Sequence, residues 1–364
     1  MGTPKSGTTS LQNLLAANRP VLRKHGYLYP GKRPGHFLEV LDLREAGFRG
    51  HRFEGSEGAW DRVVKEVLAH RGPALLSHEI LGASTRPVID KAVGSFGDRP
   101  VRVLVTCRDL GRQVPAVWQE GVKNGDKETY REFLDKVLGA WDGPDTRANM
   151  WRAQNLASLG ARWAERVGTE NVVFVTVPPS GASKDLLWQR FATAAGLPEA
   201  DYQVADQPRN PSMGTVETEL LRRLLAHLPE DVPFPVYSRQ VKRRLAERTL
   251  VLTKAGGTLT VPEDRRPAVA EMAAAINASL VEQGFPVVGD IADLEPAYSS
   301  SGTSPDDVPD AVLLERALEV MGPMVLRDGP HGEGRAPGKG GKAARVGGRL
   351  RGRRGGDDAS ADHP

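Results

Sequence analysis

The chain has 364 residues, of which 39% are hydrophobic and 26% are charged, as is typical of a soluble globular protein. No apolar run approaches the roughly 20 residues of a membrane-spanning helix, so we expect no transmembrane segment. Residues 329–364 contribute +4 to the net charge of +3, which leaves −1 for the rest and argues against a specific nucleic-acid surface there. The single cysteine, Cys107, cannot form an internal disulfide and favours a reducing, cytoplasmic location.

The stretch GTPKSGTTSLQ at residues 2–12 has the character of a phosphate-binding loop. Gly2 and Gly7 have the spacing of the nucleotide-triphosphatase loop, but Thr8 stands at its lysine position and Lys5 lies inside the loop. The backbone N–H groups of residues 5–9 and the following helix can cradle a phosphate. A strand normally precedes such a loop. Only Met1 precedes Gly2, so we expect no signal peptide and either a truncated chain or a start assigned too late.

Further along, strand-like and helix-like patterns alternate. Short β-branched runs at 74–77, 101–107 and 171–177 predict strands that are buried on both faces. Between them, apolar residues at helical spacing predict four helices. This alternation predicts an α/β fold of three layers, with a central parallel sheet flanked by helices and a mostly helical part from about 213 to 285. The four predicted helices cover 59–70, 111–124, 130–139 and 150–168.

Polar residues directly follow two of these strands. His78 and Glu79 come after 74–77, and adjacent extended residues point to opposite sides, so only one of them should face a substrate. Arg108 comes after 101–107, and its planar guanidinium suits bidentate phosphate binding, although pairing with Asp109 is an alternative. His36, in GKRPGHFLEVLDL, is a candidate for an acceptor pocket or, alternatively, a surface-loop histidine.

The stretch PKSGTTSLQ (4–12) resembles the 5′-phosphosulfate loop of the P-loop sulfotransferases, P-K-[ST]-G-T-[ST]. The resemblance covers roughly residues 1–225. It implies a P-loop fold and the donor 3′-phosphoadenosine 5′-phosphosulfate (PAPS), without a metal. The acceptor would be a hydroxyl or amine of a small molecule, sugar or lipid. The resemblance also implies a catalytic Lys5 within a donor-binding loop formed by Pro4, Lys5, Ser6, Gly7, Thr8 and Thr9.

The same resemblance assigns the 3′-phosphate to Arg108. The family's serine eight residues later is Ala116 here, a contact that Arg112 or a backbone group could replace. RNPSMG (209–214) resembles a segment that closes over the nucleotide in bacterial relatives, which makes Arg209 and Ser212 candidate contacts, with a plain turn as the equal alternative. Family members use a histidine or a glutamate after a strand as the catalytic base. Glu79 is the preferred candidate here, with His78 or neither as alternatives.

Two other functions stay open: a P-loop kinase, and an inactive nucleotide-binding or interaction protein of the same fold.

The predicted domains are a sulfotransferase-like domain (1–294), a linker (295–310), a short helix (311–328) and a tail (329–364). The tail is rich in glycine and arginine and has almost no apolar residues, which predicts disorder.

Overall fold

The computed structural model describes residues 1–45, 47, 53–147, 150–183, 185–204, 212–252, 257–300 and 302–327. It divides the chain into two units, Met1–Val320 and Met321–Pro364. The predicted disordered tail (329–364) lies outside the described residues. None of the described helices is both long and apolar enough to cross a membrane.

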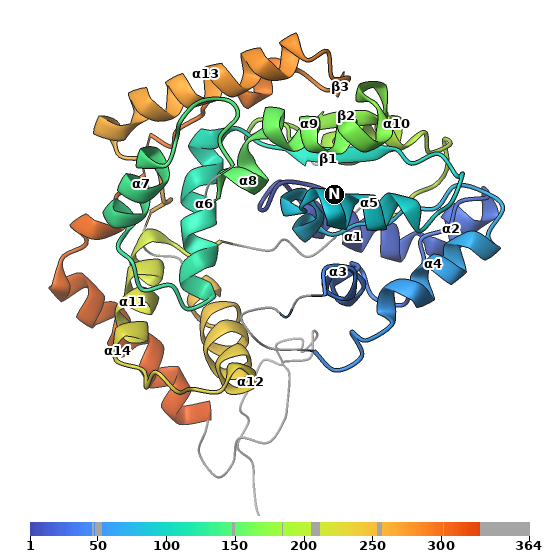
Figure 1. Cartoon of the computed structure of the whole chain (residues 1–364). Coiled ribbons are helices and arrows are strands. Elements are labelled where there is room, and N and C mark those ends of the chain that lie inside the picture. The colour runs from blue at the N-terminus through green and yellow to red at the C-terminus, as the bar shows by residue number, and fades with distance from the viewer. Residues whose placement is uncertain are drawn as a thin grey trace, which may run out of the picture. The chain divides into compact units, whose positions relative to one another are not determined.

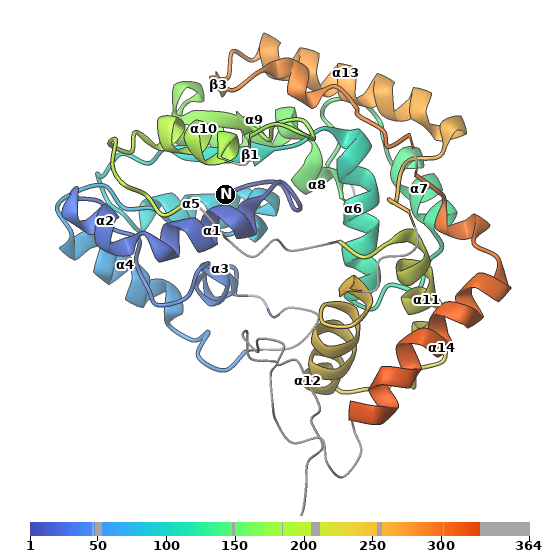
Figure 2. The same ribbon diagram turned by 180° about the vertical axis from the view of Figure 1, so that it is seen from behind.

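The strands of the first unit form a parallel sheet with the order β1-β2-β3. They are β1 (Val103–Cys107), β2 (Val172–Thr176) and β3 (Val287–Val288), and every residue of β1 and β2 is buried. Such continuous β-branched runs are typical of strands covered on both faces. The chain N-terminus lies beside β1 (Figures 1 and 2), where Gly2 bridges Thr106 in parallel.

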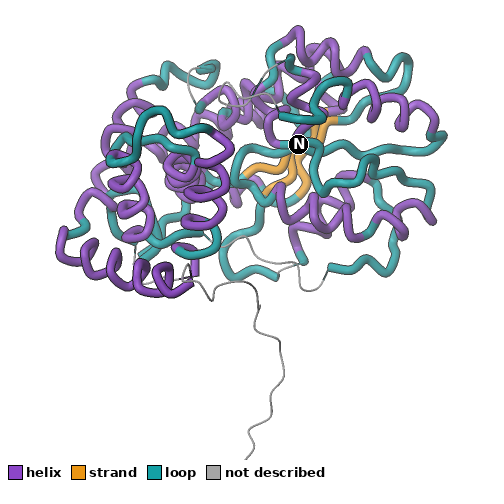
Figure 3. Tube along the Cα trace, turned by 90° about the horizontal axis from the view of Figure 1, so that it is seen from below, coloured by secondary structure: helices purple, strands orange, loops and turns teal. Residues whose placement is uncertain are grey.

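Helices surround these strands (Figure 3). Three features set helix ends: Thr129 and Glu132 form a capping box at α7, Asp109 caps α6, and Asn155 caps α9. The α-helices are α1 (Thr8–Ala17), α2 (Arg19–Lys24), α3 (Phe37–Leu43), α4 (Ala59–Ala69), α5 (Arg86–Gly94), α6 (Leu110–Lys123), α7 (Tyr130–Gly139), α8 (Trp151–Gln154), α9 (Leu156–Val167), α10 (Leu186–Ala195), α11 (Thr215–Ala226), α12 (Phe234–Tyr237), α13 (Arg266–Glu282) and α14 (Asp310–Arg327).

Both faces of the sheet are covered by helices. On one face, Leu104, Val173 and Val175 share a buried cluster with leucines of α1 and with aromatic residues of α10. On the other face, Phe174 packs edge-to-face against Phe285 at 5.4 Å between ring centroids. Helix α9 approaches this pair so closely that a Cβ on Gly160 would lie 2.8 Å from the Phe285 ring. The described chain is therefore α/β with a parallel sheet between helices.

Three segments differ from the sequence-based expectation. The predicted helix over 150–168 is broken at Asn155, whose side chain accepts from Ser158 N and donates to Thr146 O. The segment 74–77 forms only an isolated parallel bridge, Leu28 to Ala74, and no ladder. Within the predicted linker 295–310, Asp306 accepts the Arg131 N–H at the start of α7 at 2.8 Å, so this part is attached to the body.

The helical part predicted from 213 to 285 contains several helix types. A π-helix spans Ser238–Ala246, directly after α12. Short 3-10 helices at Leu250–Leu252 and Glu263–Arg265 precede α13. The π-helix carries Lys242, whose Nζ donates to Glu120 Oε1 on α6. Lys5 of the N-terminal loop binds the other oxygen of the same carboxylate.

Candidate functional site

The loop between residue 2 and α1 is anchored to the end of β1. A Cβ on Gly2 would lie 2.0 Å from Thr106 Oγ1, so only glycine fits at this bridge. Lys5 (φ 71°) and Gly7 (φ 80°) are left-handed, and residues of this conformation are typical of anion-binding nests of backbone N–H groups. No described side chain caps α1, and its first turn has no acidic residue. The N–H groups of that turn are therefore available to an anion.

Side chains from other elements hold the loop in place. Ser6 Oγ and Thr106 Oγ1 share a hydrogen bond of 2.8 Å in the buried interior. Gln113 of α6 donates through Nε2 to the Pro4 carbonyl and to Gln154 Oε1. Sequence reasoning did not identify Gln113 or Gln154. The available signal was a glutamine on the buried face of an amphipathic helix, which requires a partner for its amide.

Lys5 points toward α6 rather than into open solvent. Its Nζ lies 2.6 Å from Glu120 Oε2. Glu120 also lies 3.0 Å from Lys242 Nζ and 4.0 Å from Lys123 Nζ. Burial raises the pKa of Glu120, but these three cations outweigh burial and hold that pKa at about 2. Glu120 is thus ionised at neutral pH, and an anion that binds Lys5 competes with this carboxylate.

Arg108 follows β1 and is half-buried. Its Nε is buried and has no hydrogen-bond partner among the described residues. Burial, together with the nearby Arg112, lowers the pKa of Arg108 to about 10, so it stays cationic at neutral pH. The alternative pairing with Asp109 is not formed, because Asp109 accepts from Arg112 Nε and from the Ala297 N–H. Arg108 is therefore a cationic group at the end of a buried strand, and its Nε has no acceptor among the described residues.

Arg112 and Ala116 are both on α6. Arg112 is bound to Asp109 and also donates to the Pro178 carbonyl at 3.2 Å. These bonds fix its side chain at the start of the helix, so Arg112 replaces the serine contact only if it leaves these partners. Ala116 is half-exposed.

His78 and Glu79 lie close together, contrary to the expectation that they point apart. The extended chain ends at His78, and Glu79 starts a 3-10 helix, Glu79–Ala83. As a result, His78 Nε2 lies 3.8 Å from Glu79 Oε2. His78 Nδ1 accepts from the Ile80 N–H at 3.3 Å, which leaves the proton of a neutral ring on Nε2. Burial lowers the pKa of His78 although Glu79 raises it, so the imidazole is neutral at pH 7.

His36 is neither a surface histidine nor an open acceptor-pocket group. It is 2% exposed. The Ser77 N–H donates to its Nδ1 at 3.1 Å, and its Nε2 lies 3.2 Å from the Pro30 carbonyl. Its ring packs against Tyr29 at a centroid distance of 5.0 Å. Burial lowers its pKa to about 4. Both ring nitrogens are thus used in holding two loops together.

The remaining predicted site residues lie apart from this arrangement or outside the described chain. Arg209 lies outside the described residues, and Ser212 is exposed. Of the loop threonines, Thr8 is buried and Thr9 is exposed. A cavity of about 320 Å³ opens beside Lys5, between α6 and α7. Within the described ranges, no group of three or more His, Cys, Asp or Glu side chains is placed to hold a metal ion.

Comparison with known proteins adds no relative: no family model, no curated protein and no solved structure matches the chain. The functional argument therefore rests on the loop, on Arg108, and on the pair His78 and Glu79.

Proposed function

We propose that this chain is a sulfotransferase that moves a sulfuryl group from PAPS to a hydroxyl or amine acceptor. The proposal joins the resemblance of residues 4–12 to the phosphosulfate loop with the geometry of that loop. Two left-handed residues and an uncapped helix start form a suitable cradle for the 5′-phosphosulfate.

The observation that carries the proposal is the Nε of Arg108, which has no hydrogen-bond partner in the part of the chain that the structure describes. Thr3 N donates to Thr106 O at 2.9 Å, so the loop starts beside the end of β1, and Arg108 follows two residues later in that strand direction. A buried polar group without a partner in the described chain calls for an explanation, and a bound anion would supply the acceptor that Arg108 Nε lacks. A nucleotide with both a 5′- and a 3′-phosphate group would supply one anion to the loop and one to Arg108.

In the proposed reaction the acceptor oxygen or nitrogen attacks sulfur in line with the bridging oxygen. The bond between sulfur and acceptor forms, the bond between sulfur and the bridging oxygen breaks, and adenosine 3′,5′-bisphosphate leaves. Glu79 takes the acceptor proton, with the neutral His78 as the alternative base. Lys5 and the loop N–H groups stabilise the negative charge that develops on the bridging oxygen. For this step Lys5 exchanges Glu120 for the donor.

A second candidate is a nucleotide-binding protein of the same fold that does not turn over. The observation that favours it is the 2.6 Å ion pair between Lys5 and Glu120, which occupies the proposed catalytic cation. An active enzyme requires this pair to open, whereas a binding protein does not.

Ligand-induced stabilisation separates the candidates. Adenosine 3′,5′-bisphosphate at 100 times its dissociation constant should raise the free energy of unfolding by about 2.7 kcal/mol, with AMP and ATP at the same concentration as comparisons. Preference for ATP would favour a P-loop kinase. Binding of the bisphosphate without turnover of labelled PAPS, across a panel of sugar, lipid and phenolic acceptors, would favour the binding protein.

A further inference from the structure

Four arginines lie close together beside the 3-10 helix Glu79–Ala83. Arg44 follows α3, Arg147 and Arg152 lie just before and within α8, and Arg162 lies on α9. These elements meet because α3 and α8 both contact the 3-10 helix, and α8 also contacts α9. Positive charge is therefore concentrated next to the helix that begins with the preferred candidate base.

Arg162 is the buried member of this arginine cluster, with only 4% of its surface exposed. Its Nη1 donates to the carbonyl and the hydroxyl of Ser158, both at 3.1 Å. Its Nη2 donates to the Gly82 carbonyl at 2.9 Å and to the Arg152 carbonyl at 2.6 Å. Arg162 thus joins the 3-10 helix to α8. Its Nε is buried and has no hydrogen-bond partner among the described residues.

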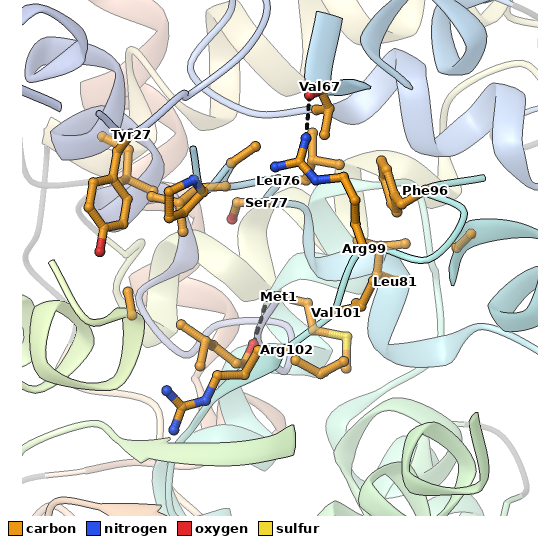
Figure 4. A pocket seen from close by; sticks show the side chains of 18 of the residues that line it. Met1, Tyr27, Val67, Leu76, Ser77, Leu81, Phe96, Arg99, Val101 and Arg102 are labelled. Atoms are coloured by element: carbon orange, nitrogen blue, oxygen red, sulfur yellow. Dashed lines mark hydrogen bonds between the residues drawn. The ribbon is translucent and has the colours of Figure 1, made fainter. Parts of the chain in front are cut away.

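The 3-10 helix and α8 both adjoin the phosphate-binding loop. A Cβ on Gly82 would lie 3.7 Å from the Gly2 carbonyl oxygen. The preceding residue, Leu81, lines the largely apolar cavity of about 570 Å³ that Figure 4 shows. Helix α8 is joined to the same loop, since Gln113 donates both to a loop carbonyl and to Gln154 Oε1 at 3.0 Å. The arginine cluster therefore lies next to the loop as well as to the 3-10 helix.

No carboxylate neutralises the cluster within the part of the chain that the structure describes, because no Asp or Glu there lies within ion-pair distance of its guanidinium groups. Burial lowers the pKa of Arg162 to about 10, Arg147 and Arg152 act in the same direction, and Glu165 acts against them. The Glu165 carboxylate is itself bound to another arginine at 2.5 Å. Burial and, after it, Arg152 also lower the pKa of Arg44.

This concentration of positive charge suits an oxyanion. Repulsion among like charges disfavours such a cluster unless an anion binds to it. A guanidinium binds carboxylates, sulfates and phosphates through parallel hydrogen bonds. In the proposed reaction the loop and Arg108 take the two anionic ends of the donor. A further anion, bound beside the candidate base, would therefore belong to the acceptor.

We propose that Arg44, Arg147 and Arg152 bind an oxyanion of the acceptor, a carboxylate, sulfate or phosphate group, and that Arg162 positions α8 for this contact. The acceptor hydroxyl or amine would then lie toward Glu79. The assignment to the acceptor rests on the proposed sulfotransferase activity, whereas the anion site itself does not.

The test compares anionic probes with neutral counterparts on the chain saturated with adenosine 3′,5′-bisphosphate, so that the donor site is filled. Methyl glucuronide is paired with its amide, and glycerol 3-phosphate is paired with glycerol. Titrations followed by NMR give the dissociation constants. We expect an anionic probe to bind about tenfold more tightly than its neutral counterpart. The tighter of the two anionic probes distinguishes a sugar carboxylate from a phosphate ester.

Arg152→Gln locates the binding. The side chain of Arg152 is exposed, and its backbone carbonyl, which holds Arg162, is retained in the variant. We expect about tenfold weaker binding of the anionic probe and no change for the neutral one, with partial recovery in Arg152→Lys. Arg23→Gln, at an exposed arginine of α2, is the matched control. With labelled PAPS, Arg152→Gln should raise KM for the anionic acceptor and leave kcat unchanged.

Equal binding of anionic and neutral probes, or equal losses in Arg152→Gln and Arg23→Gln, would overturn the proposal. Failure of the proposed function gives a different result: no acceptor receives a sulfuryl group, while binding that depends on Arg152 persists, and the anion site stands. If the bisphosphate does not bind, the same titrations without it decide between these outcomes. Turnover of neutral acceptors, with equal KM values for acid and amide in the native chain, would retain the sulfotransferase and reject the anionic acceptor.

Discussion

At the residue scale, the ion pair with Glu120 determines whether Lys5 is available to a bound nucleotide. If their ion pair competes with a bound nucleotide, Glu120→Gln removes the competing charge and leaves the shape of the side chain. We expect adenosine 3′,5′-bisphosphate to bind about 3- to 10-fold more tightly, measured by calorimetry. Glu128→Gln is the matched control, because Glu128 lines the same cavity but pairs with Lys136. Weaker binding in Glu120→Gln would mean that the carboxylate positions Lys5 instead of competing for it.

Arg108 provides a test that distinguishes the two phosphate groups of the donor. Arg108→Ala should cost about 1.5–3 kcal/mol in binding of adenosine 3′,5′-bisphosphate, because a charge-assisted contact is lost, and should leave binding of adenosine 5′-phosphosulfate nearly unchanged. Arg102→Ala, an exposed arginine just before the same strand, serves as the control. Equal losses for the two nucleotides would remove Arg108 from the 3′-phosphate site.

The pair His78 and Glu79 offers two candidates for the base within 3.8 Å. Glu79→Gln should retain nucleotide binding and lose about 10²–10⁴ in turnover, as expected for loss of a general base. His78→Gln should be milder, since the Nδ1 lone pair of His78 accepts from Ile80 N and its Nε2 carries the proton of the neutral ring. The rates with saturating PAPS decide the question. The reverse ranking would assign the base to His78, and near-native rates in both variants would exclude the pair.

At the scale of elements, the break between α8 and α9 depends on Asn155. This buried side chain caps α9 by accepting from Ser158 N, and donates to Thr146 O. Asn155→Ala removes the cap and leaves buried groups without partners, so we expect a loss of about 1–3 kcal/mol in the free energy of unfolding. Urea denaturation measures this loss. Asn171→Ala is a control at the far end of the same helix region, and a similar loss there would contradict a specific role for the cap.

The sequence-based predictions succeeded for elements whose signal is local. The strands β1 and β2 end within two residues of their predicted ends, because each is a run of β-branched residues buried on both faces. The prediction of one continuous helix over 150–168 was wrong at Asn155, because the apolar periodicity of the sequence continues through a residue whose side chain caps α9. The short pairing of 74–77 could not be predicted, since strand formation needs a partner on each side.

The candidate site was predictable in part for the same reason. The loop could be recognised from its own residues, and Arg108 from its place after a strand. Lys5 and Glu120 are 115 positions apart, and no local pattern indicates that they meet. His36 lies among glycine, proline and basic residues, which suggested a surface loop. It is buried because Ser77 and Pro30 supply partners from two distant segments.

At the scale of the whole molecule, His36 makes stability depend on pH. Its pKa falls from 6.5 to about 4 on folding, so the unfolded chain binds the proton more tightly. The stability that the neutral ring contributes is complete above pH 6.5 and is lost as the pH falls through 4. A shift of this size corresponds to about 3 kcal/mol.

We therefore expect His36→Gln to be less stable than the native chain at pH 7 and to lose less stability between pH 6.5 and 4. Urea unfolding at several pH values gives both slopes. His25→Gln, at an exposed histidine, should follow the native slope. Parallel curves for the native chain and His36→Gln would show that other groups cause the acid sensitivity.

Glu120 is shared between Lys5 in the N-terminal loop and Lys242 in the π-helix Ser238–Ala246. One carboxylate thus stands between two cations that belong to distant parts of the chain. If an anion draws Lys5 away, Glu120 is left to Lys242 and to Lys123 of its own helix, and it holds the π-helix more tightly against α6. Thermodynamic reciprocity requires the converse: whatever tightens that helix must raise the affinity of the loop for the anion by the same free energy. Anion binding at the N-terminal loop and docking of the π-helix against α6 are then thermodynamically coupled.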